Sequence, residues 1–316
     1  MTDSWPELDF PSWRETCAAL HLYTQIVGKY RLAREPWVNH SWHATLYVNA
    51  RGLTTSMVPD GPGGVEIRFD LLRHEVIGST TDGRTERFGL APMSVAEFHS
   101  RFLDLLRSLG GTPTLHGRPN EVADPVPFAE DRVRRPYDGD TAGRFFQALV
   151  KISFVLQRFR TAFIGKASPV HLFWGSFDLA VTRFSGRPAP VHPGGIPALP
   201  DAVTREAYSH EVSSAGFWPG GGGPIEYPAF YSYAYPAPAG FAEARVEPAE
   251  AFYDEALGEF LLPYDAVRTS RTPEKTLMAF LDSTYGAAAG LGAWNRRALE
   301  CPIGKPRHPR PLLRGE

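Results

Sequence analysis

The side chains with the clearest chemical potential lie in one segment, residues 170–183, where polar and aromatic residues alternate with apolar ones. Successive side chains of a β-strand point to opposite faces, so an extended segment places Trp174, Ser176 and Asp178 on one face. We expect the apolar face to pack in the core and the polar face to contact a ligand in a cavity, with Asp178 as an acid or base. The alternative is that Asp178 only pairs with a nearby arginine. Arg183 is a further candidate ligand contact.

A second polar segment contains His210 and Glu211, which are consecutive and therefore point to opposite faces of a strand. One of the two side chains must therefore point toward the covered face of the predicted sheet. An inward histidine is a fair general base because the imidazole pKa lies near neutrality. The candidate catalytic residues are Asp178, His210 and Glu211, with His171 as a ligand or electrostatic aid. The alternative for His210 is a buried structural histidine.

Two histidines, His40 and His171, come just before the first predicted strand of each half of the chain. If the halves pack about a pseudo-twofold axis, the two imidazoles could meet and hold a divalent metal or an anion. The alternative is two structural histidines bonded to backbone carbonyls. The sequence has no HExxH, CxxC or EF-hand pattern, so we expect no closed structural zinc site.

Aromatic and glycine-rich segments supply candidate ligand contacts. Tyr231 and Tyr233 share one face of a predicted strand and could form a pocket wall, although core packing explains them equally well. Residues 216–224 lack the Gly-Lys-Ser/Thr of a phosphate loop, and no helix start follows, so we expect no nucleotide cofactor. A lid that closes Trp218 over a ligand is one interpretation of this loop, with Glu226 as a neighbouring contact.

Lysine is rare in the sequence, and two of its occurrences follow matched glycines. Lys29 and Lys166 each come directly after a predicted helix and can neutralise the negative end of the helix dipole. Otherwise they offer paired cations to an anionic ligand.

Hydrophobic periodicity predicts the elements that must position these residues. Capping boxes at Ser12/Glu15 and Ser94/Glu97 open two helices, which we expect to end at Gly28 and at Gly110-Gly111. Asp82-Gly83 is typical of a hairpin turn. Further helices are expected at 140–164 and 272–289, and strands at 42–48, 53–58, 65–71, 75–80, 170–182, 208–217, 229–235 and 259–262.

The two halves of the chain repeat short motifs. Ile26–Lys29 corresponds to Phe163–Lys166, and Phe102-Leu103-Asp104 recurs as Phe280-Leu281-Asp282. We infer a diverged duplication, each copy a helix, an antiparallel sheet and a returning helix, with chance similarity as the alternative. The predicted organisation is a first α+β repeat at 1–116, a Pro-rich connector at 117–139, a second repeat at 140–300 with a Pro- and Gly-rich insertion at 187–228, and a basic tail at 301–316.

Composition excludes several classes of protein. The chain has 316 residues, with 33 Lys+Arg against 35 Asp+Glu, which argues against a general nucleic-acid binder. It has no apolar run of roughly 18 residues that could cross a membrane. Its first residues lack the features of a secretory signal. Cys17 and Cys301, at opposite ends of the chain, indicate two unpaired thiols. We therefore expect a cytoplasmic protein without nucleic-acid or membrane partners.

Several segments carry a family resemblance: YTQIVGKYRLA (23–33), SPVHLFWGSFDLAVTRFSGR (168–187), REAYSHEVSSAGFWPGGGG (205–223) and GEFLLPYDAVR (258–268). In these motifs the chain resembles a bacterial family known as domain of unknown function 5996, over nearly its whole length. The resemblance implies a family and no activity, so the site residues depend on the chemistry above.

The sequence thus predicts an α+β protein of two related halves, with a pocket on the second half beneath the 187–228 insertion. The leading hypothesis is a small-molecule enzyme, a hydrolase or a metal-assisted one. The competing hypothesis is a non-catalytic protein that binds a small ligand in an aromatic pocket. A third interpretation is a structural or interaction protein. Substrate, metal identity and oligomeric state lie beyond the sequence.

Overall fold

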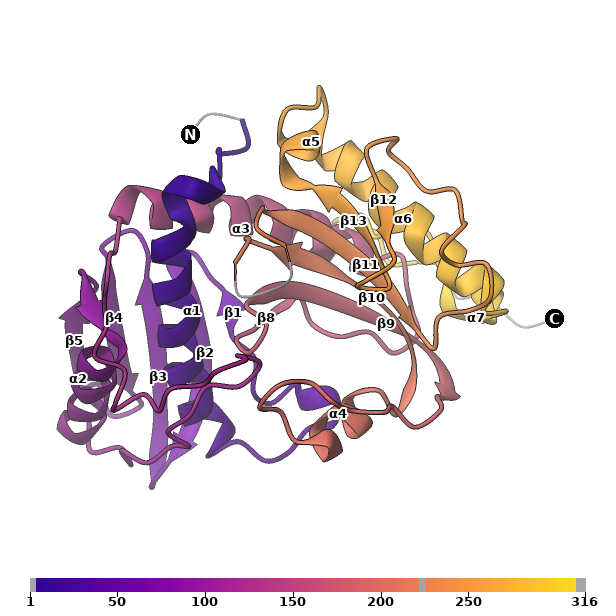
Figure 1. The fold of residues 1–316 in the computed structure, drawn as a ribbon. Coiled ribbons are helices and arrows are strands. Elements are labelled where there is room, and N and C mark those ends of the chain that lie inside the picture. Colours follow the sequence, from indigo (N-terminus) through magenta and orange to yellow (C-terminus); the bar gives the residue numbers. More distant parts are fainter. Residues whose placement is uncertain (1–3, 222–224, 311–316) are drawn as a thin grey trace.

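The computed structural model describes residues 4–221 and 225–310, and it confirms the predicted α+β class (Figure 1). The described helices are α1 (Phe10–Leu32), α2 (Val95–Ser108), α3 (Gly139–Arg160), α4 (Asp201–Ala207), α5 (Tyr264–Arg268), α6 (Pro273–Leu291) and α7 (Arg296–Leu299), with a 3-10 turn η1 (Asn39–Ser41). The described strands are β1 (Tyr47–Val48), β2 (Gly52–Asp60), β3 (Gly63–Asp70), β4 (Glu75–Thr80), β5 (Thr85–Gly89), β6 (Met93–Ser94), β7 (Arg134–Arg135), β8 (His171–Phe173), β9 (Asp178–Pro188), β10 (His210–Trp218), β11 (Ala229–Tyr235), β12 (Phe252–Asp254) and β13 (Glu259–Pro263).

The first half is an antiparallel meander, β1-β2-β3-β4-β5, with α1 and α2 packed together beside it. The predicted turn at Asp82-Gly83 joins β4 to β5, and Gly83 has a φ of 90°, which suits glycine. Aromatic stacking joins helices and sheet, because Phe98 of α2 lies parallel to Tyr23 of α1 at 4.2 Å between ring centroids and to Phe69 of β3 at 6.1 Å. This core fixes α1, whose other side faces the second half.

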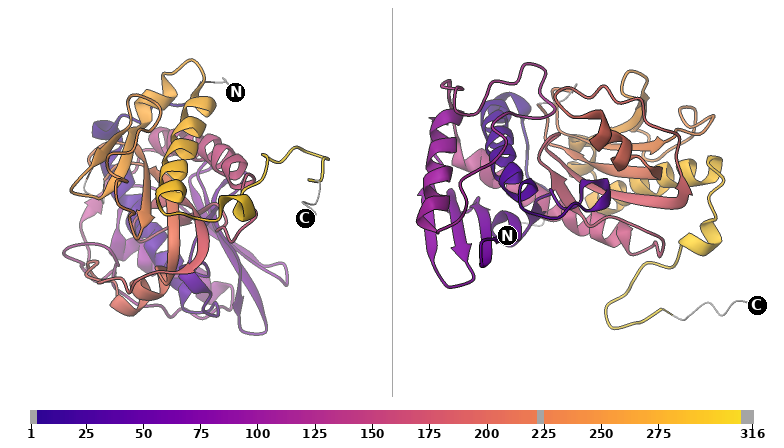
Figure 2. Two further views of the ribbon diagram at one scale, coloured as in Figure 1. Left: turned by 90° about the vertical axis from the view of Figure 1, so that its right-hand side faces the viewer. Right: turned by 90° about the horizontal axis from the view of Figure 1, so that it is seen from below.

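The second half is an antiparallel sheet with the strand order β12-β13-β11-β10-β9-β8. One face packs against α3 and α6, which both lie on the same side of the sheet (Figures 1 and 2). The odd-numbered side chains of β9, such as Leu179 and Val181, are buried on that face. The even-numbered side chains point to the opposite face, which α1 and the loops around it cover.

The two sheets meet edge to edge. Leu46 and Leu172 form a reciprocal antiparallel bridge, with N–H···O distances of 2.9 and 2.8 Å. Both halves follow the predicted order of helix, antiparallel sheet and returning helix, while the duplication itself stays a prediction. The predicted equivalence of His40 and His171 stays a prediction, as the duplication does; His40 lies six residues before Leu46 and His171 lies one residue before Leu172.

The first helix begins and ends elsewhere than predicted. Asp9, and not Ser12, caps α1, since the Asp9 carboxylate accepts the backbone N–H of Ser12 at 3.2 Å. The helix also continues past Gly28 to Leu32. By contrast, the predicted cap at Ser94 is confirmed, with its hydroxyl accepting the N–H of Glu97 at 3.1 Å.

Two predicted strands are interrupted by turns. Residues 42–44 form a turn, Leu46 forms an isolated bridge, and only Tyr47–Val48 lie in a strand. Residues 170–182 do not form one strand but the hairpin of β8 and β9, which turns at 174–177 with Phe177 at a φ of 58°. Within β9 the predicted alternation still holds, so Asp178 and Thr182 share one face. Helix 140–164 ends earlier than predicted, at Arg160.

The 187–228 segment contains the strand predicted at 208–217, which is β10 and lies in the second sheet between β9 and β11. It also contains the short helix α4, which the sequence did not predict. Residues 301–310 of the tail lie beyond the sheets, where Gly304 N–H donates to the Thr161 hydroxyl at 3.0 Å (Figure 2). Residues 222–224 of the predicted lid and 311–316 of the predicted tail lie outside the described residues. None of the described helices is long and apolar enough to cross a membrane.

Candidate functional site

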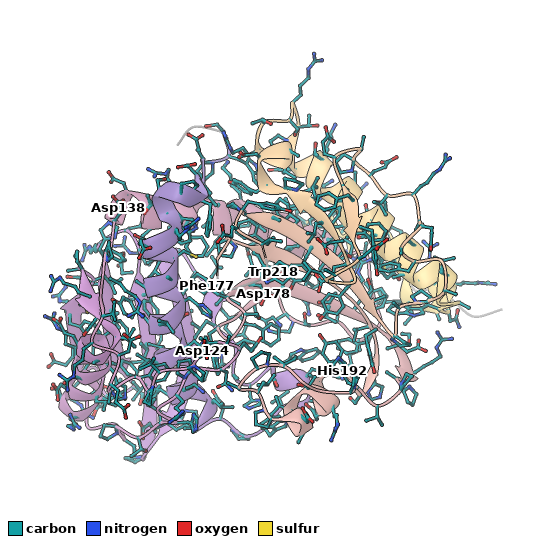
Figure 3. All side chains as sticks on the ribbon, viewed as in Figure 1. Asp124, Asp138, Phe177, Asp178, His192 and Trp218 are labelled. Carbon is teal, nitrogen blue, oxygen red and sulfur yellow. The ribbon has the colours of Figure 1, made fainter. Side chains whose placement is uncertain are left out.

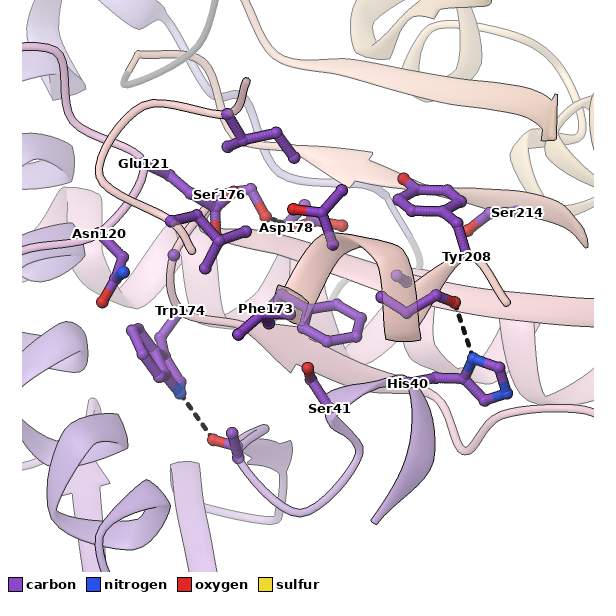
Figure 4. A pocket seen from close by; sticks show the side chains of 18 of the residues that line it. His40, Ser41, Asn120, Glu121, Phe173, Trp174, Ser176, Asp178, Tyr208 and Ser214 are labelled. Atoms are coloured by element: carbon purple, nitrogen blue, oxygen red, sulfur yellow. Dashed lines mark hydrogen bonds between the residues drawn. The ribbon is translucent and has the colours of Figure 1, made fainter. Parts of the chain in front are cut away.

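A cavity of about 790 Å³ lies between the free face of the second sheet and α1 (Figure 4). First-half residues around Trp37–Ala44 form one side, and residues 196–207, including α4, form a roof together with the connector at 116–121. The roof segments are tied to each other, because Glu121 N–H donates to the Pro197 carbonyl at 2.9 Å. Part of the 187–228 segment thus lines this cavity, which lies between the two halves and not on the second half alone; that the cavity binds a ligand stays a prediction.

Strand pairing places the polar side chains of the sheet side by side. Ser214 of β10 pairs with Thr182 of β9 and Tyr233 of β11, and the Ser214 and Thr182 hydroxyls are 2.8 Å apart. Glu259 begins β13 and also lines the cavity. Period-2 alternation therefore builds a polar sheet surface on the face opposite the helices.

Three glycines make room for side chains that line the cavity. A Cβ at Gly28 would overlap the Trp174 indole, one at Gly175 would overlap the Glu121 carboxylate, and one at Gly216 would overlap the Tyr231 hydroxyl. Trp174, Glu121 and Tyr231 can therefore occupy these positions only because the three neighbouring residues are glycines without a Cβ atom.

Asp178 lies at the centre of the molecule, close to Trp218 and Phe177 (Figure 3). Its side chain is buried, and its two carboxylate oxygens accept hydrogen bonds from the hydroxyls of Ser176 and Tyr231. Burial raises the pKa of Asp178, and these two hydrogen bonds oppose that change. The carboxyl group is therefore held in a fixed orientation and ionises less readily than an exposed aspartate.

Two glutamates join Asp178 around the cavity. Burial and the charge of Asp178 raise the pKa of Glu121 to about 7, against the opposing effect of Lys29. Burial, Asp178 and Asp254 together raise the pKa of Glu259 to about 8. Near neutral pH these carboxyl groups are close to their ionisation midpoints, as expected of groups that transfer protons.

Lys29 faces the same end of the cavity. Its side chain is 2% exposed, its ammonium donates to the side-chain oxygen of Asn120, and it lies 5.3 Å from the centre of the Trp174 ring. Burial lowers the pKa of Lys29 to about 8. Lys29 lies in the last turn of α1, so neutralising the negative end of the helix dipole stays a predicted role beside its contacts in the cavity.

An aromatic wall, formed by Trp218, Tyr231 and Tyr233, lies beside Asp178 and Glu259. The ring centroids of Trp218 and Tyr231 are 4.7 Å apart, and those of Tyr231 and Tyr233 are 6.1 Å apart. The Tyr233 hydroxyl lies 2.9 Å from that of Tyr208, which follows α4. Trp174 closes the far end and is anchored by its indole N–H to the Ala44 carbonyl at 2.6 Å (Figure 4).

Polar atoms of three lining residues are buried without a hydrogen-bond partner among the described residues: Ser41 Oγ, Thr204 Oγ1 and Glu259 Oε2. Thr204 is only 1% exposed. A buried polar atom without a partner is costly, and all three belong to residues that line the cavity.

His40 lines the cavity and connects its side to its roof. Its Nδ1–H donates to the Ala207 carbonyl of α4 at 2.7 Å, and Lys166 Nζ lies 2.6 Å from its Nε2 (Figure 4). The backbone N–H of His40 donates to the Glu206 carboxylate at 3.0 Å. Burial and the nearby Lys166 charge lower the pKa of His40, which fits a neutral ring that accepts from Lys166. Lys166 itself reaches the cavity only through His40.

The other predicted histidines lie outside the cavity lining that the described residues form. His171 is fully buried, and burial lowers its pKa to about 3. The His210 ring lies 6.1 Å from the His40 ring, while Glu211 pairs with Arg187 at 2.7 Å. The structure therefore does not bring His171 or His210 together with Asp178.

Arg183 and Glu226 are also placed away from the cavity. Arg183 lies on the helix face of β9, where its guanidinium is 3.5 Å from the Phe159 ring centre and 4.3 Å from that of Tyr285. Glu226 forms an exposed ion pair with Arg14 at 3.4 Å. Strand alternation explains Arg183, because odd-numbered residues of β9 face the helices.

The expected metal site at His40 and His171 does not form, since their rings are not in contact and only His40 lines the cavity. In the part of the chain that the structure describes, no group of three or more His, Cys, Asp or Glu side chains could hold a metal ion.

The predicted lid at Trp218 is anchored on the side that the structure describes. Trp13 Nε1–H donates to the Pro219 carbonyl at 2.9 Å, and Cys17 contacts the Gly220 carbonyl at 3.0 Å. Trp218 itself packs on Tyr231. These contacts fix residues 218–220 against α1.

Glu121 and Glu259 are the main lining residues that the sequence analysis missed. Glu121 lies in an aperiodic connector, with a φ of 56°, where no local pattern indicates its position. Glu259 interrupts the otherwise apolar strand 259–262 and shares its face with Leu261, a pattern that could have marked it.

Comparison with known proteins gives a family and no activity. No match was found among curated proteins or among solved structures. A family model described as a family of unknown function, DUF5996, matches residues 5–301, which span both halves and the whole cavity. The chain therefore belongs to the DUF5996 family.

Proposed function

We propose that the protein is an enzyme that acts on a small molecule in the cavity, with Asp178 and Glu121 as its acid–base groups. The observation that carries this proposal is the clustering of carboxyl groups with raised pKa values around one cavity of about 790 Å³. Such pairs supply a proton donor and a proton acceptor at the same pH, because each charge opposes ionisation of the other.

Hydrolysis is the reaction class that these groups fit best. A carboxylate can take a proton from water while a protonated carboxyl group donates one to the leaving group. Asp178 is oriented by Ser176 and Tyr231, and Glu121 is supported by Lys29, whose charge limits the rise in its pKa. The partner of Asp178 in this proposal is Glu121 and not His210, which lies outside the cavity lining formed by the described residues. In this proposal the side chains of Asp178 and Glu121 carry out both proton transfers.

The test is a comparison of turnover on a panel of chromogenic esters, amides, glycosides and phosphate esters. Asp178→Asn should lower turnover of any active substrate by about 100-fold or more, the usual effect of losing a general acid or base. Asp104→Asn, at an exposed position on α2 outside the cavity, is the matched control and should leave turnover unchanged. Turnover within twofold of wild type in Asp178→Asn would exclude Asp178 as a catalytic residue.

The second candidate is a non-catalytic protein that binds a small ligand. It is favoured by one observation, that both carboxylate oxygens of Asp178 already accept hydrogen bonds from side chains. In that case Asp178 fixes the shape of the cavity. A binder should show no turnover on the panel, and Asp178→Asn should retain most of its affinity for a ligand.

A further inference from the structure

Charge around the cavity is unbalanced at the aromatic wall. The described lining includes the carboxyl groups of Glu121, Asp178 and Glu259. The positive charge of Lys29 lowers the pKa of Glu121 but does not act on the other two carboxyl groups. None of the ion pairs between described residues includes any of the three carboxyl groups. The side chains that donate to Asp178 are hydroxyls, and none of the described residues places a basic side chain in an ion pair with Asp178 or Glu259, the two carboxyl groups nearest the aromatic wall.

One carboxylate oxygen of Glu259 also lacks a hydrogen-bond donor among the described residues. Its Oε2 is buried and has no partner within the described parts of the chain. The groups that face it are Asp178 of β9, Asp254 and Tyr253 of β12, Tyr231 and Tyr233 of β11, and Tyr208 after α4. When they ionise, the carboxyl groups add negative charge here, and none of these groups supplies a positive one. An incoming group that carries both N–H donors and positive charge would meet both needs.

From this arrangement we propose that the ligand of the cavity is an organic amine that binds as its ammonium ion. Its N–H groups donate to Glu259 and Asp178, and its hydrocarbon part lies on the aromatic wall. This inference rests on the proposed function in one respect only, namely that the protein binds its small molecule in this cavity.

The aromatic side chains of the cavity suit a cation. Faces of Trp and Tyr attract ammonium groups through the negative charge of their π-systems. Two aromatic rings that line the cavity already contact a lysine ammonium group. Lys29 lies over Trp174 at 5.3 Å, and Lys166 lies over Phe184 at 4.8 Å. The aromatic wall of Trp218, Tyr231 and Tyr233 has no such lysine among the cation–π contacts of the described residues, although it is the one beside the carboxyl groups.

An anionic ligand, the alternative that the lysines suggested, fits less well. Lys29 already donates to Asn120, and Lys166 is hydrogen-bonded to His40. An anion near Glu259 and Asp178 would add to the negative charge there.

Amine binding should be linked to proton release. Pairing with an ammonium requires ionised carboxyl groups, while burial and mutual repulsion keep Glu259 partly protonated in the empty cavity. Affinity for an amine should therefore increase between pH 6 and pH 8.5, with release of protons to the buffer. A neutral analogue should show neither effect.

The experiment is calorimetric titration with three probes of similar shape and different charge: 2-phenylethylamine, 2-phenylethanol and 3-phenylpropionate. Wild-type protein should bind the amine at least about tenfold more tightly than the alcohol, and the acid more weakly still. Glu259→Gln should weaken amine binding by about tenfold or more and change alcohol binding less than twofold. Glu255→Gln, four residues away at an exposed position, is the matched control and should behave as wild type.

The inference is overturned if the alcohol binds as tightly as the amine, if the acid binds best, or if no probe binds the wild-type protein. These outcomes are separate from failure of the proposed function. Amine binding with Asp178-independent turnover would support the ligand class and contradict the catalytic role. Asp178-dependent turnover of a neutral or anionic substrate would do the reverse.

Discussion

Gly28, within helix α1, lies directly against the indole ring of Trp174 from the turn between β8 and β9. The ring is held there by its hydrogen bond to Ala44, so one side chain touches both the helix and the 37–44 segment. This contact positions one end of the cavity. It also explains why glycine, a poor helix former, lies in a helix that does not end there.

Gly28→Ala should destabilise the protein despite the better helix propensity of alanine. The added Cβ would overlap a ring that cannot move without losing its hydrogen bond, and overpacking of this kind costs about 1 to 3 kcal/mol. Gly143→Ala in α3 is the matched control. A Cβ at Gly143 meets no other atom of the described residues within 4 Å, so this change should be neutral or stabilise by up to about 1 kcal/mol. Denaturant unfolding measures both, and equal effects would contradict the steric argument.

Glu259 should make the protein less stable as pH rises. Its folded-state pKa is about 8, above the ordinary value of 4.5, so between these values the folded chain holds a proton that the unfolded chain releases. The free energy of unfolding then falls with increasing pH. Glu259→Gln removes this loss, and between pH 5 and pH 8 its stability relative to wild type should rise by about 1 to 3 kcal/mol. Glu255→Gln should leave the slope unchanged, and an unchanged slope in Glu259→Gln would show that Glu259 is ionised in the folded protein.

The contact of α4 with the 39–41 turn should weaken in acid. His40 must be neutral to accept from Lys166 while it donates to Ala207, and its lowered pKa means that this contribution is lost as pH falls below the unfolded value of 6.5. A protonated ring would face Lys166 and His210, with only Glu206 to offset them.

Hydrogen–deuterium exchange checks this prediction. After correction for intrinsic rates, amides of residues 201–207 should exchange faster near pH 5.5 than near pH 7.5, while those of α2 should not. His40→Gln, which cannot titrate, should abolish the difference. If wild-type α4 is equally protected at both pH values, His40 does not control the roof.

The two cysteines should differ in reactivity. Both are free thiols in the structure, but Cys17 is buried against Gly220, and burial raises its pKa. Cys301 is partly exposed. A chromogenic disulfide reagent should therefore modify Cys301 in the native protein and Cys17 only after unfolding. Rapid modification of native Cys301→Ser protein would contradict the burial of Cys17.

The helices and most strands could be predicted because their signals are local. The strand 229–235 and the helix that begins at Pro273 follow directly from alternation, capping residues and periodicity. The segment 170–182 was misread because its alternation continues through a turn. Gly175-Ser176 was the local indication of that turn, and the positive φ of Phe177 completes it.

The site was predictable only in part. Asp178, Trp174 and Tyr231 could be found because they lie on strands or their turns in a recognisable pattern. Glu121 could not, since its position depends on contacts of the connector with residues distant in sequence, such as Gln25, which accepts the N–H of Asn120 at 2.8 Å. Residue type alone suggests His210 as a site residue. It lies at the first position of β10, however, and does not line the cavity.

The bridge between Leu46 and Leu172 has a consequence for how the chain can be divided. Each of these residues protects the outer border of the other half's sheet, where unpaired backbone groups would otherwise recruit foreign strands. Fragments cut in the connector would expose these borders, together with the apolar flank of α1. Such fragments should aggregate when produced singly and recombine into a native-like complex when produced together.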